Sequence, residues 1–159
     1  MKVKNIGQLS LTSESLVQLS TNHEAVATSI ELAMRKELPL VSSVVAVGHG
    51  LPFIVCLLTL ETMPSSGQSP STKQARLAPH VVAALQEIGV SVATVEEARE
   101  NKDLMQTIIH GVQRVNTHCH FTLGSDPAPV KRFFILSHDL RLEDGDLTPM
   151  LELRRSGLP

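Results

Sequence analysis

In this 159-residue chain, the side chains that could bind a metal are most concentrated at His118-Cys119-His120. Neighbouring side chains on a helix or strand point in different directions, so three consecutive residues rarely share one ion. The sequence also has no second ligand pair such as Cys-x-x-Cys. We therefore predict no metal site and place this segment at a helix end or in a loop. The other histidines are scattered singly, which favours surface or turn positions: His23, His49, His80, His110 and His138.

Cys56 is the second candidate for chemistry, as a nucleophile that would act with a histidine and an acid. A reactive thiolate needs exposure and nearby positive charge, whereas Cys56 lies in an apolar run over residues 54–60. We therefore predict a small, buried side chain at this position. The second cysteine is Cys119, and a structural disulfide is not expected in a chain with intracellular features.

Four cations form the third candidate, a weak patch for a phosphate group or an acidic partner: Lys131, Arg132, Arg154 and Arg155. The alternative, which we favour, is an ordinary solvated surface. The formal net charge is −2, and the sequence contains neither Trp nor Tyr. A broad basic footprint and aromatic stacking platforms are therefore both missing, and we expect no nucleic-acid partner.

The elements that must position these side chains follow from hydrophobic periodicity. Helical spacing of apolar residues predicts main helices over 25–38, 77–88 and 102–115. Apolar, largely β-branched runs predict strands over 41–47, 53–60 and 131–136. This order predicts an α+β domain, with a small mixed sheet packed against helices.

Local signals refine this layout. Gly48-His49-Gly50 predicts the turn of a hairpin between the first two strands. Thr94, with Glu97 three residues later, predicts a capping box at a helix start. Residues 7–22 predict two short strands or a hairpin, residues 61–72 a surface loop, and residues 151–155 a short terminal element.

The sequence also bears on location. The first five residues are basic, but no apolar segment follows them, so we expect no secretory signal. The longest apolar run, residues 54–60, is far too short to span a bilayer. We therefore expect a cytoplasmic protein without a transmembrane segment.

Six segments follow one another in an order and spacing that a random chain rarely reproduces. They are residues 37–48 (ELPLVSSVVAVG), 51–60 (LPFIVCLLTL), 83–97 (AALQEIG to VEE), 111–116 (GVQRVN), 131–136 (KRFFIL) and 146–155 (DLTPMLELRR). Together they resemble the C-terminal lid domain of the bubblegum-type long-chain acyl-CoA synthetases, which are adenylate-forming enzymes. The resemblance covers residues 7 to 155 and divides the chain into a degenerate hinge or hairpin segment, 1–24, and the domain itself, 25–159.

The resemblance implies a lid that works on a large partner domain. In the family, a large N-terminal domain holds the acyl pocket, most of the ATP site and the phosphate-binding loop. The lid closes over it in one orientation for adenylate formation and rotates for thioester formation. The family uses ATP, Mg and CoA; for this chain alone we expect no cofactor.

The residues that carry the family's chemistry are matched less well than the segments that form its helices and strands. Where the family has a lysine that stabilises negative charge during adenylation, this chain has Glu152, followed by Leu153-Arg154-Arg155. A carboxylate there would repel the developing charge. The family's Gly-Arg-x-Lys entry motif is matched only by residues 7–10 (GQLS), and its Gly-Gly-Glu-Asn-Val loop by residues 22–26 (NHEAV). The following Ile-Glu pair is retained as Ile30-Glu31.

These departures set the functional hypotheses. The first is a non-catalytic pseudoenzyme that acts as an interaction or structural subunit with other proteins, with no catalytic residue of its own. The second is a lid fragment or split subunit of a long-chain fatty-acid–CoA ligase, for which a lysine near position 152 would be needed. The third is a residual binder of acyl-CoA or nucleotide without turnover.

Overall fold

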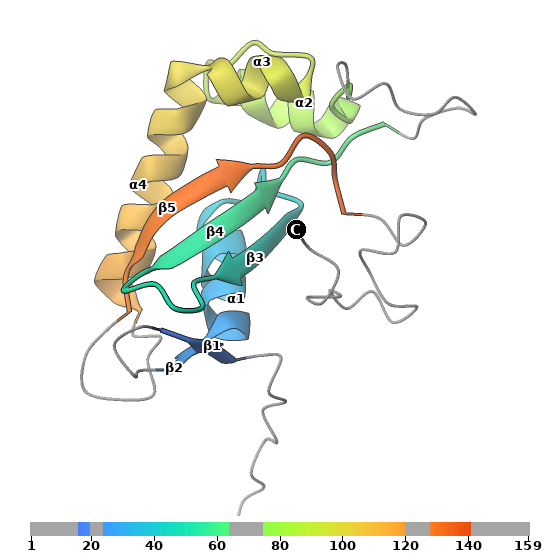
Figure 1. Ribbon diagram of the computed structural model, residues 1–159. Coiled ribbons are helices and arrows are strands. Elements are labelled where there is room, and N and C mark those ends of the chain that lie inside the picture. The colour runs from blue at the N-terminus through green and yellow to red at the C-terminus, as the bar shows by residue number, and fades with distance from the viewer. Residues whose placement is uncertain (1–15, 20–23, 64–74, 120–127, 141–159) are drawn as a thin grey trace, which may run out of the picture.

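Three of the predicted strands form one mixed sheet in the computed structural model, which describes residues 16–19, 24–63, 75–119 and 128–140. They are β3 (Ser43–Val47), β4 (Ile54–Thr59) and β5 (Val130–Ile135), and β4 lies in the middle (Figure 1). β3 and β4 are antiparallel, as the expected hairpin requires, while β4 and β5 are parallel. The α+β prediction is confirmed.

The hairpin between β3 and β4 turns at glycines, as predicted. Gly50 has a φ of 72°, a backbone conformation that side chains with a Cβ atom rarely adopt. Gly48 is buried, and a Cβ atom there would stand 2.9 Å from the carbonyl oxygen of Phe53. Both positions of the turn therefore need glycine, one for its φ angle and the other for lack of space.

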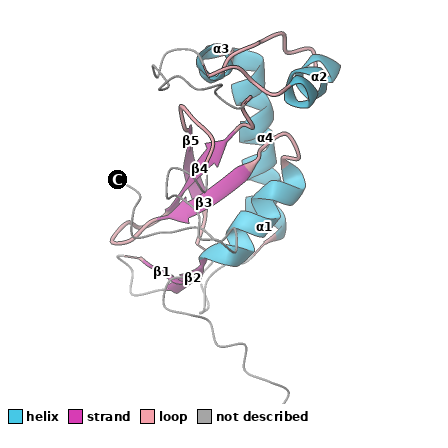
Figure 2. Ribbon diagram, turned by 90° about the vertical axis from the view of Figure 1, so that its right-hand side faces the viewer, coloured by secondary structure: helices cyan, strands magenta, loops and turns pink. Residues whose placement is uncertain are grey.

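Two long helices cover one face of the sheet, α1 (Ala27–Glu37) beside β3 and α4 (Lys102–His118) beside β5 (Figure 2). Both were predicted from apolar spacing, and α4 continues three residues beyond the predicted end. The two helices also contact each other where a Cβ atom on Gly111 would stand only 2.6 Å from Leu38 Cδ2. The largest helix side chains in the core have no exposed surface: Ile30, Met34, Leu104 and Ile108.

A second, two-stranded sheet precedes α1. β1 (Leu16–Gln18) pairs antiparallel with β2 (Glu24–Val26). The prediction placed both strands within 7–22 and began the helix at 25, which is wrong for β2. Ala25 is fully buried and pairs with Val17, so the chain stays extended there and α1 starts at Ala27. The proposed boundary after residue 24 lies inside β2 and remains a prediction.

The two short helices lie together at one end of the molecule, near the start of α4: α2 (Pro79–Glu87) and α3 (Val95–Glu100) (Figure 1). The predicted capping box is present, because Thr94 Oγ1 accepts from the Glu97 amide and the Glu97 carboxylate accepts from the Thr94 amide, both at 3.3 Å. A single β-bridge between Thr62 and Leu77 connects this end to the continuation of β4, and another between Arg76 and Thr94 joins the starts of the two short helices.

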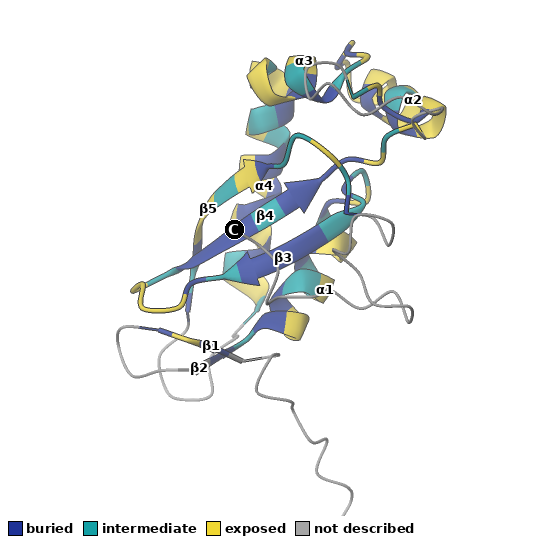
Figure 3. Ribbon diagram, turned by 45° about the vertical axis from the view of Figure 1, so that its right-hand side comes forward, coloured by how far each residue is buried: buried dark blue, intermediate teal, exposed yellow. Residues whose placement is uncertain are grey.

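Burial is highest in the middle of the sheet, where β4 is buried along nearly all of its length (Figure 3). Among the residues that the structure describes, no helix has the length and apolar character needed to cross a membrane. Several predictions lie outside the described ranges: the hairpin residues 7–15, the loop residues 64–72 and the terminal element 151–155.

Candidate functional site

Glu31, one of the residues that carry the family resemblance, has a structural partner at the edge of the sheet. β3 is an edge strand, and the backbone N–H of Ala46 donates to Glu31 Oε1 of α1 at 2.9 Å. Ala46 has no exposed surface, so a backbone N–H without a hydrogen-bond acceptor there would lower the stability of the fold. The retained Ile30-Glu31 pair therefore buries an apolar side chain and supplies an acceptor to the sheet.

Asn116 of α4, at the end of the matched segment 111–116, bonds in the same way to the opposite edge strand, β5. Its Nδ2 donates to the Val130 carbonyl at 2.8 Å, and its Oδ1 accepts from the Val130 N–H at 2.9 Å. Val130 is 1% exposed at the start of β5. One amide side chain thus satisfies both backbone groups of a buried edge residue, which neither an aliphatic residue nor an ionised carboxylate could do.

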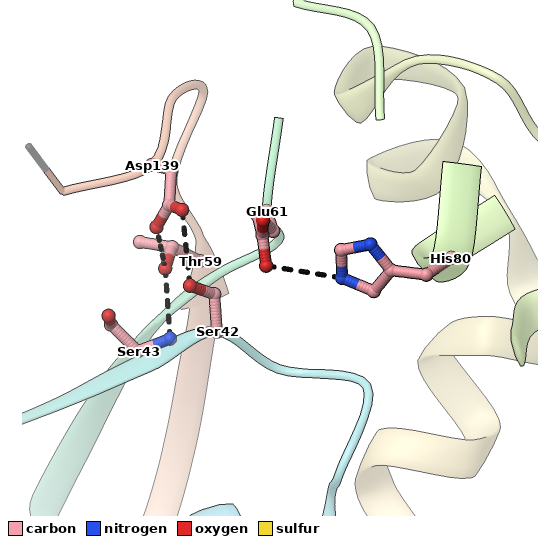
Figure 4. Close-up of polar contacts among 6 residues, drawn as sticks. All are labelled: Ser42, Ser43, Thr59, Glu61, His80 and Asp139. Carbon is pink, nitrogen blue, oxygen red and sulfur yellow. Dashed lines mark hydrogen bonds and ion pairs between the residues drawn. The ribbon is translucent and has the colours of Figure 1, made fainter. Parts of the chain in front are cut away.

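A cluster of hydroxyls around Asp139 joins the segment after β5 to the other two strands (Figure 4). The fully buried Thr59 hydroxyl donates to Asp139 Oδ1 at 2.6 Å and accepts from the Ser43 N–H at 3.1 Å. Ser42 Oγ donates to Asp139 Oδ2 at 3.1 Å, and the Leu140 N–H donates to Asp139 Oδ1 at 2.9 Å. We name Ser42, Thr59 and Asp139 the Asp139 clamp.

The clamp lies next to a serine and a histidine in the sequence Ser137-His138-Asp139, which has the residue types of a hydrolytic triad. Ser137 Oγ lies 3.3 Å from His138 Nδ1, but both are at the surface and adjacent in the chain. The Asp139 carboxylate accepts from Thr59, Ser42 and Leu140 and makes no hydrogen bond with His138. These three residues therefore lack the acid-to-histidine contact that orients a general base.

The remaining histidines that the structure describes do not converge. His80, on α2, lies 3.1 Å from Glu61, just beyond the end of β4, and both side chains are exposed (Figure 4). His110 contacts Gln106 one helical turn away, and His49 is exposed in the hairpin turn. Within the described ranges no three residues of the His, Cys, Asp and Glu types are grouped to hold a metal. His23 and His120 lie outside those ranges.

Cys56 is buried, as predicted. It has no exposed surface on β4, and burial, with the Glu31 carboxylate adding to it, raises the pKa of its thiol to about 12. The thiol therefore stays protonated at neutral pH and cannot act as the nucleophile that was considered. Cys119 and Cys56 are both free thiols.

Two members of the predicted cationic patch lie on β5. Ile54 pairs with Val130 and Val55 with Arg132, so Lys131 is an extra residue, a β-bulge, and has no partner on β4. Its Nζ stands 5.7 Å from the centre of the Phe53 ring, within cation–π distance. Both cations are exposed, and neither forms an ion pair with a described residue.

The other members of that patch, Arg154 and Arg155, lie outside the described ranges, as does Glu152. The four-cation patch, the exchange of lysine for Glu152 and the lack of a catalytic residue therefore stay predictions. The clamp was not found from the sequence. Its one signal was a threonine at the end of an otherwise aliphatic strand, Thr59, which needs a hydrogen-bond partner when buried.

Curated proteins similar to this chain are acyl-CoA ligases. The rat long-chain-fatty-acid–CoA ligase ACSBG1 is 32% identical over 128 residues, which cover 79% of this chain and 17% of the ligase. The human ligase of the same name is 30% identical, and human ACSBG2 is 25% identical, over the same length. The chain thus spans about one sixth of the length of these relatives. No family model matches it.

A solved structure has the same fold. The A-PCP didomain of a carboxylic acid reductase from Segniliparus rugosus, determined in complex with AMP, superposes with a TM-score of 0.54. The match covers 89% of this chain and 15% of that protein, at 13% sequence identity. Such a low identity establishes the shared fold and nothing further. It agrees with the fold that the resemblance implied.

Proposed function

Since the chain belongs to the bubblegum-type long-chain acyl-CoA synthetases, of which it covers a C-terminal piece, we propose that it serves as a lid domain. It would dock on a large domain that activates a long-chain fatty acid with ATP and transfers the acyl group to CoA. The similarity to ligases over 79% of the chain carries this proposal. It favours the lid reading over the interaction subunit that the sequence had suggested first.

The sheet edges support the proposal. Glu31 and Asn116 belong to segments that match the family, and both stabilise backbone groups of the edge strands, Ala46 and Val130. A fold that keeps these contacts keeps the rigid surface that a lid needs for docking.

The chemistry of such a lid would differ from that of the family at one position. Glu152 stands where the resemblance places the adenylation lysine. One well-placed donor at a developing charge contributes about 3–4 kcal/mol, and an anion in its place should cost more than simple removal. We infer a lid that supports thioester formation but adds nothing to adenylate formation.

The test mixes the purified chain with a long-chain acyl-CoA synthetase lacking its own lid. Adenylate formation is measured by pyrophosphate exchange. Thioester formation is measured as acyl-CoA produced from supplied acyl-adenylate and CoA. We expect the natural chain to restore only the second reaction and Glu152→Lys to restore both. Glu87→Lys, an exposed substitution on α2, is the charge-matched control. If neither the natural chain nor Glu152→Lys restores any reaction, the lid proposal is wrong.

An interaction role without a synthetase is the second candidate. Phe134 on β5 is 55% exposed, and its neighbour on the same sheet face, Arg132, has no ion pair with a described residue. Aromatic residues and arginine are enriched at protein–protein interfaces relative to the rest of the surface. Affinity capture with the natural chain and with Phe134→Ser tests this, and loss of a stoichiometric partner in the variant would support it.

A further inference from the structure

β5 is an edge strand, and the outer edge of its second half is open (Figure 1). The Leu136 N–H donates to the Leu58 carbonyl at 2.8 Å, so this amide points toward β4. Because backbone groups alternate in direction along a paired strand, those of Phe134 also point toward β4, whereas those of Phe133 and Ile135 point outward. Within the described ranges, the outward groups of these two residues have no hydrogen-bond partner.

Other edge positions of the sheet are closed by side chains. Asn116 bonds to both backbone groups of Val130 at the start of β5, and Glu31 accepts from the Ala46 N–H on β3. The open stretch therefore contains two residues, each with one outward N–H and one outward C=O. Such an edge can bind a further strand.

We propose that this open edge binds the same edge of a second copy of the chain, so that two β5 strands pair antiparallel in a two-fold symmetric dimer. In the register centred on Phe134, Phe133 of one copy lies opposite Ile135 of the other. Every outward N–H then meets an outward C=O, and the edge is complementary to itself. This inference goes beyond the lid function and does not depend on it.

The side chains on the exposed face of β5 fit this register. Phe134 is 55% exposed and would lie opposite Phe134 of the second copy, in the closer, non-hydrogen-bonded type of pair. Aromatic pairs in this position stabilise antiparallel strands. Arg132 lies two residues away on the same face, so it would be diagonal to the ring of the second copy and within reach of a cation–π contact.

The charges of the two copies allow the pairing. The two Arg132 side chains would be four residues apart along the strands, or roughly 13 Å. This separation exceeds the Debye length of about 10 Å at 0.1 M salt, so their repulsion is largely screened. The formal net charge of each copy is only −2. An extended segment of another protein could use the same backbone groups, but their symmetry about Phe134 favours a second copy.

Sedimentation equilibrium of the purified chain, from about 10 μM to about 1 mM, measures the dimer. So short a pairing belongs with the small interfaces of weak complexes, and we expect dissociation in the upper part of this range. Phe134→Glu should raise the dissociation constant at least about tenfold, because two like charges would lie directly opposite each other. Phe134→Tyr keeps the aromatic ring and should change it less than about threefold.

A second variant tests the backbone pairing. Phe133→Pro removes one outward N–H and no hydrogen bond to β4, which a proline on an edge strand permits. We expect this variant to raise the dissociation constant at least about tenfold, whereas Phe133→Leu, which keeps the N–H, should change it less than about threefold. Circular dichroism shows whether each variant is folded. If the proline variant does not fold, Phe134→Glu decides, since its side chain is at the surface.

Disulfide crosslinking tests the register. Phe134→Cys, in a Cys119→Ser background and with oxidised glutathione, should form an interchain disulfide, because the two β-carbons of such a pair are about 4.5–5.5 Å apart. The remaining thiol, Cys56, is buried. Lys131→Cys is the control and should not form the disulfide, because its two copies would be about six residues apart along the strands.

Several results would overturn the dimer. They are a monomer over the whole concentration range, a dimer that neither Phe134→Glu nor Phe133→Pro weakens, and equal crosslinking of the two cysteine variants. If the chain stays monomeric while Phe134→Ser loses a captured protein, the edge binds a different protein and the proposal is wrong. Failure of the complementation mixture bears on the lid function alone.

Discussion

Replacing Asn116, a partly buried residue of α4, with alanine should destabilise the fold. The substitution removes a donor at 2.8 Å and an acceptor at 2.9 Å from the two backbone groups of Val130. Val130 is 1% exposed, so water cannot readily satisfy the groups that are left. At about 1–3 kcal/mol for each of the two backbone groups left without a partner, the free energy of unfolding should fall by about 2–6 kcal/mol.

The assay is urea unfolding followed by far-ultraviolet circular dichroism, because the chain has no Trp or Tyr for fluorescence. Gln113→Ala, exposed on the same helix, is the control and should change stability by less than about 0.5 kcal/mol. Asn116→Asp should lose the donor at neutral pH and regain it when its carboxyl group is protonated in acid. A fall of less than about 0.5 kcal/mol in the free energy of unfolding of Asn116→Ala would show that its hydrogen bonds to Val130 do not stabilise the fold.

Three further predictions concern the core. Unfolding releases the Cys56 proton between pH 9.0 and about 12, so the free energy of unfolding should fall by roughly 1.4 kcal/mol per pH unit in that range. Cys56→Ala should reduce this slope when urea unfolding is measured at several pH values. Glu31→Ala should cost about 1–3 kcal/mol because it removes the carboxylate oxygen that accepts from the buried Ala46 N–H, whereas Glu31→Gln, which keeps an acceptor oxygen, should cost less in the same titration. Gly111→Ala should lower the melting temperature despite the better helix propensity of alanine, because the new methyl group would overlap Leu38; a rise would contradict the close packing of α1 and α4.

The main elements were predictable because each has a strong local signal. The strand over residues 53–60 is aliphatic and bounded by turn residues, and it appears as β4 within one residue at each end. The start of α1 was missed because its signal is not local. Ala25 suits a helix by propensity, yet pairing with Val17 keeps it extended.

The site was less predictable than the fold. Thr59 and Asp139 are 80 residues apart in sequence, and nothing near either one indicates the other. The prediction that Cys56 is buried succeeded because an apolar strand pattern determines burial directly. Lys131 and Arg132 were grouped as neighbours, but the bulge at Lys131 directs its ammonium group toward Phe53, and periodicity does not reveal a bulge.

The parallel pairing of β4 with β5 bears on how the chain folds and where it can be cut. Roughly 70 residues, including α2, α3 and α4, separate the two strands, whereas a short turn joins β3 to β4. Closing the longer loop costs about 2 kcal/mol more in chain entropy, so β5 should join the sheet late. Until it does, one edge of the aliphatic strand β4 has no partner. A polypeptide that ends before residue 130 would keep that edge open permanently, and we expect such a product to aggregate through strand addition.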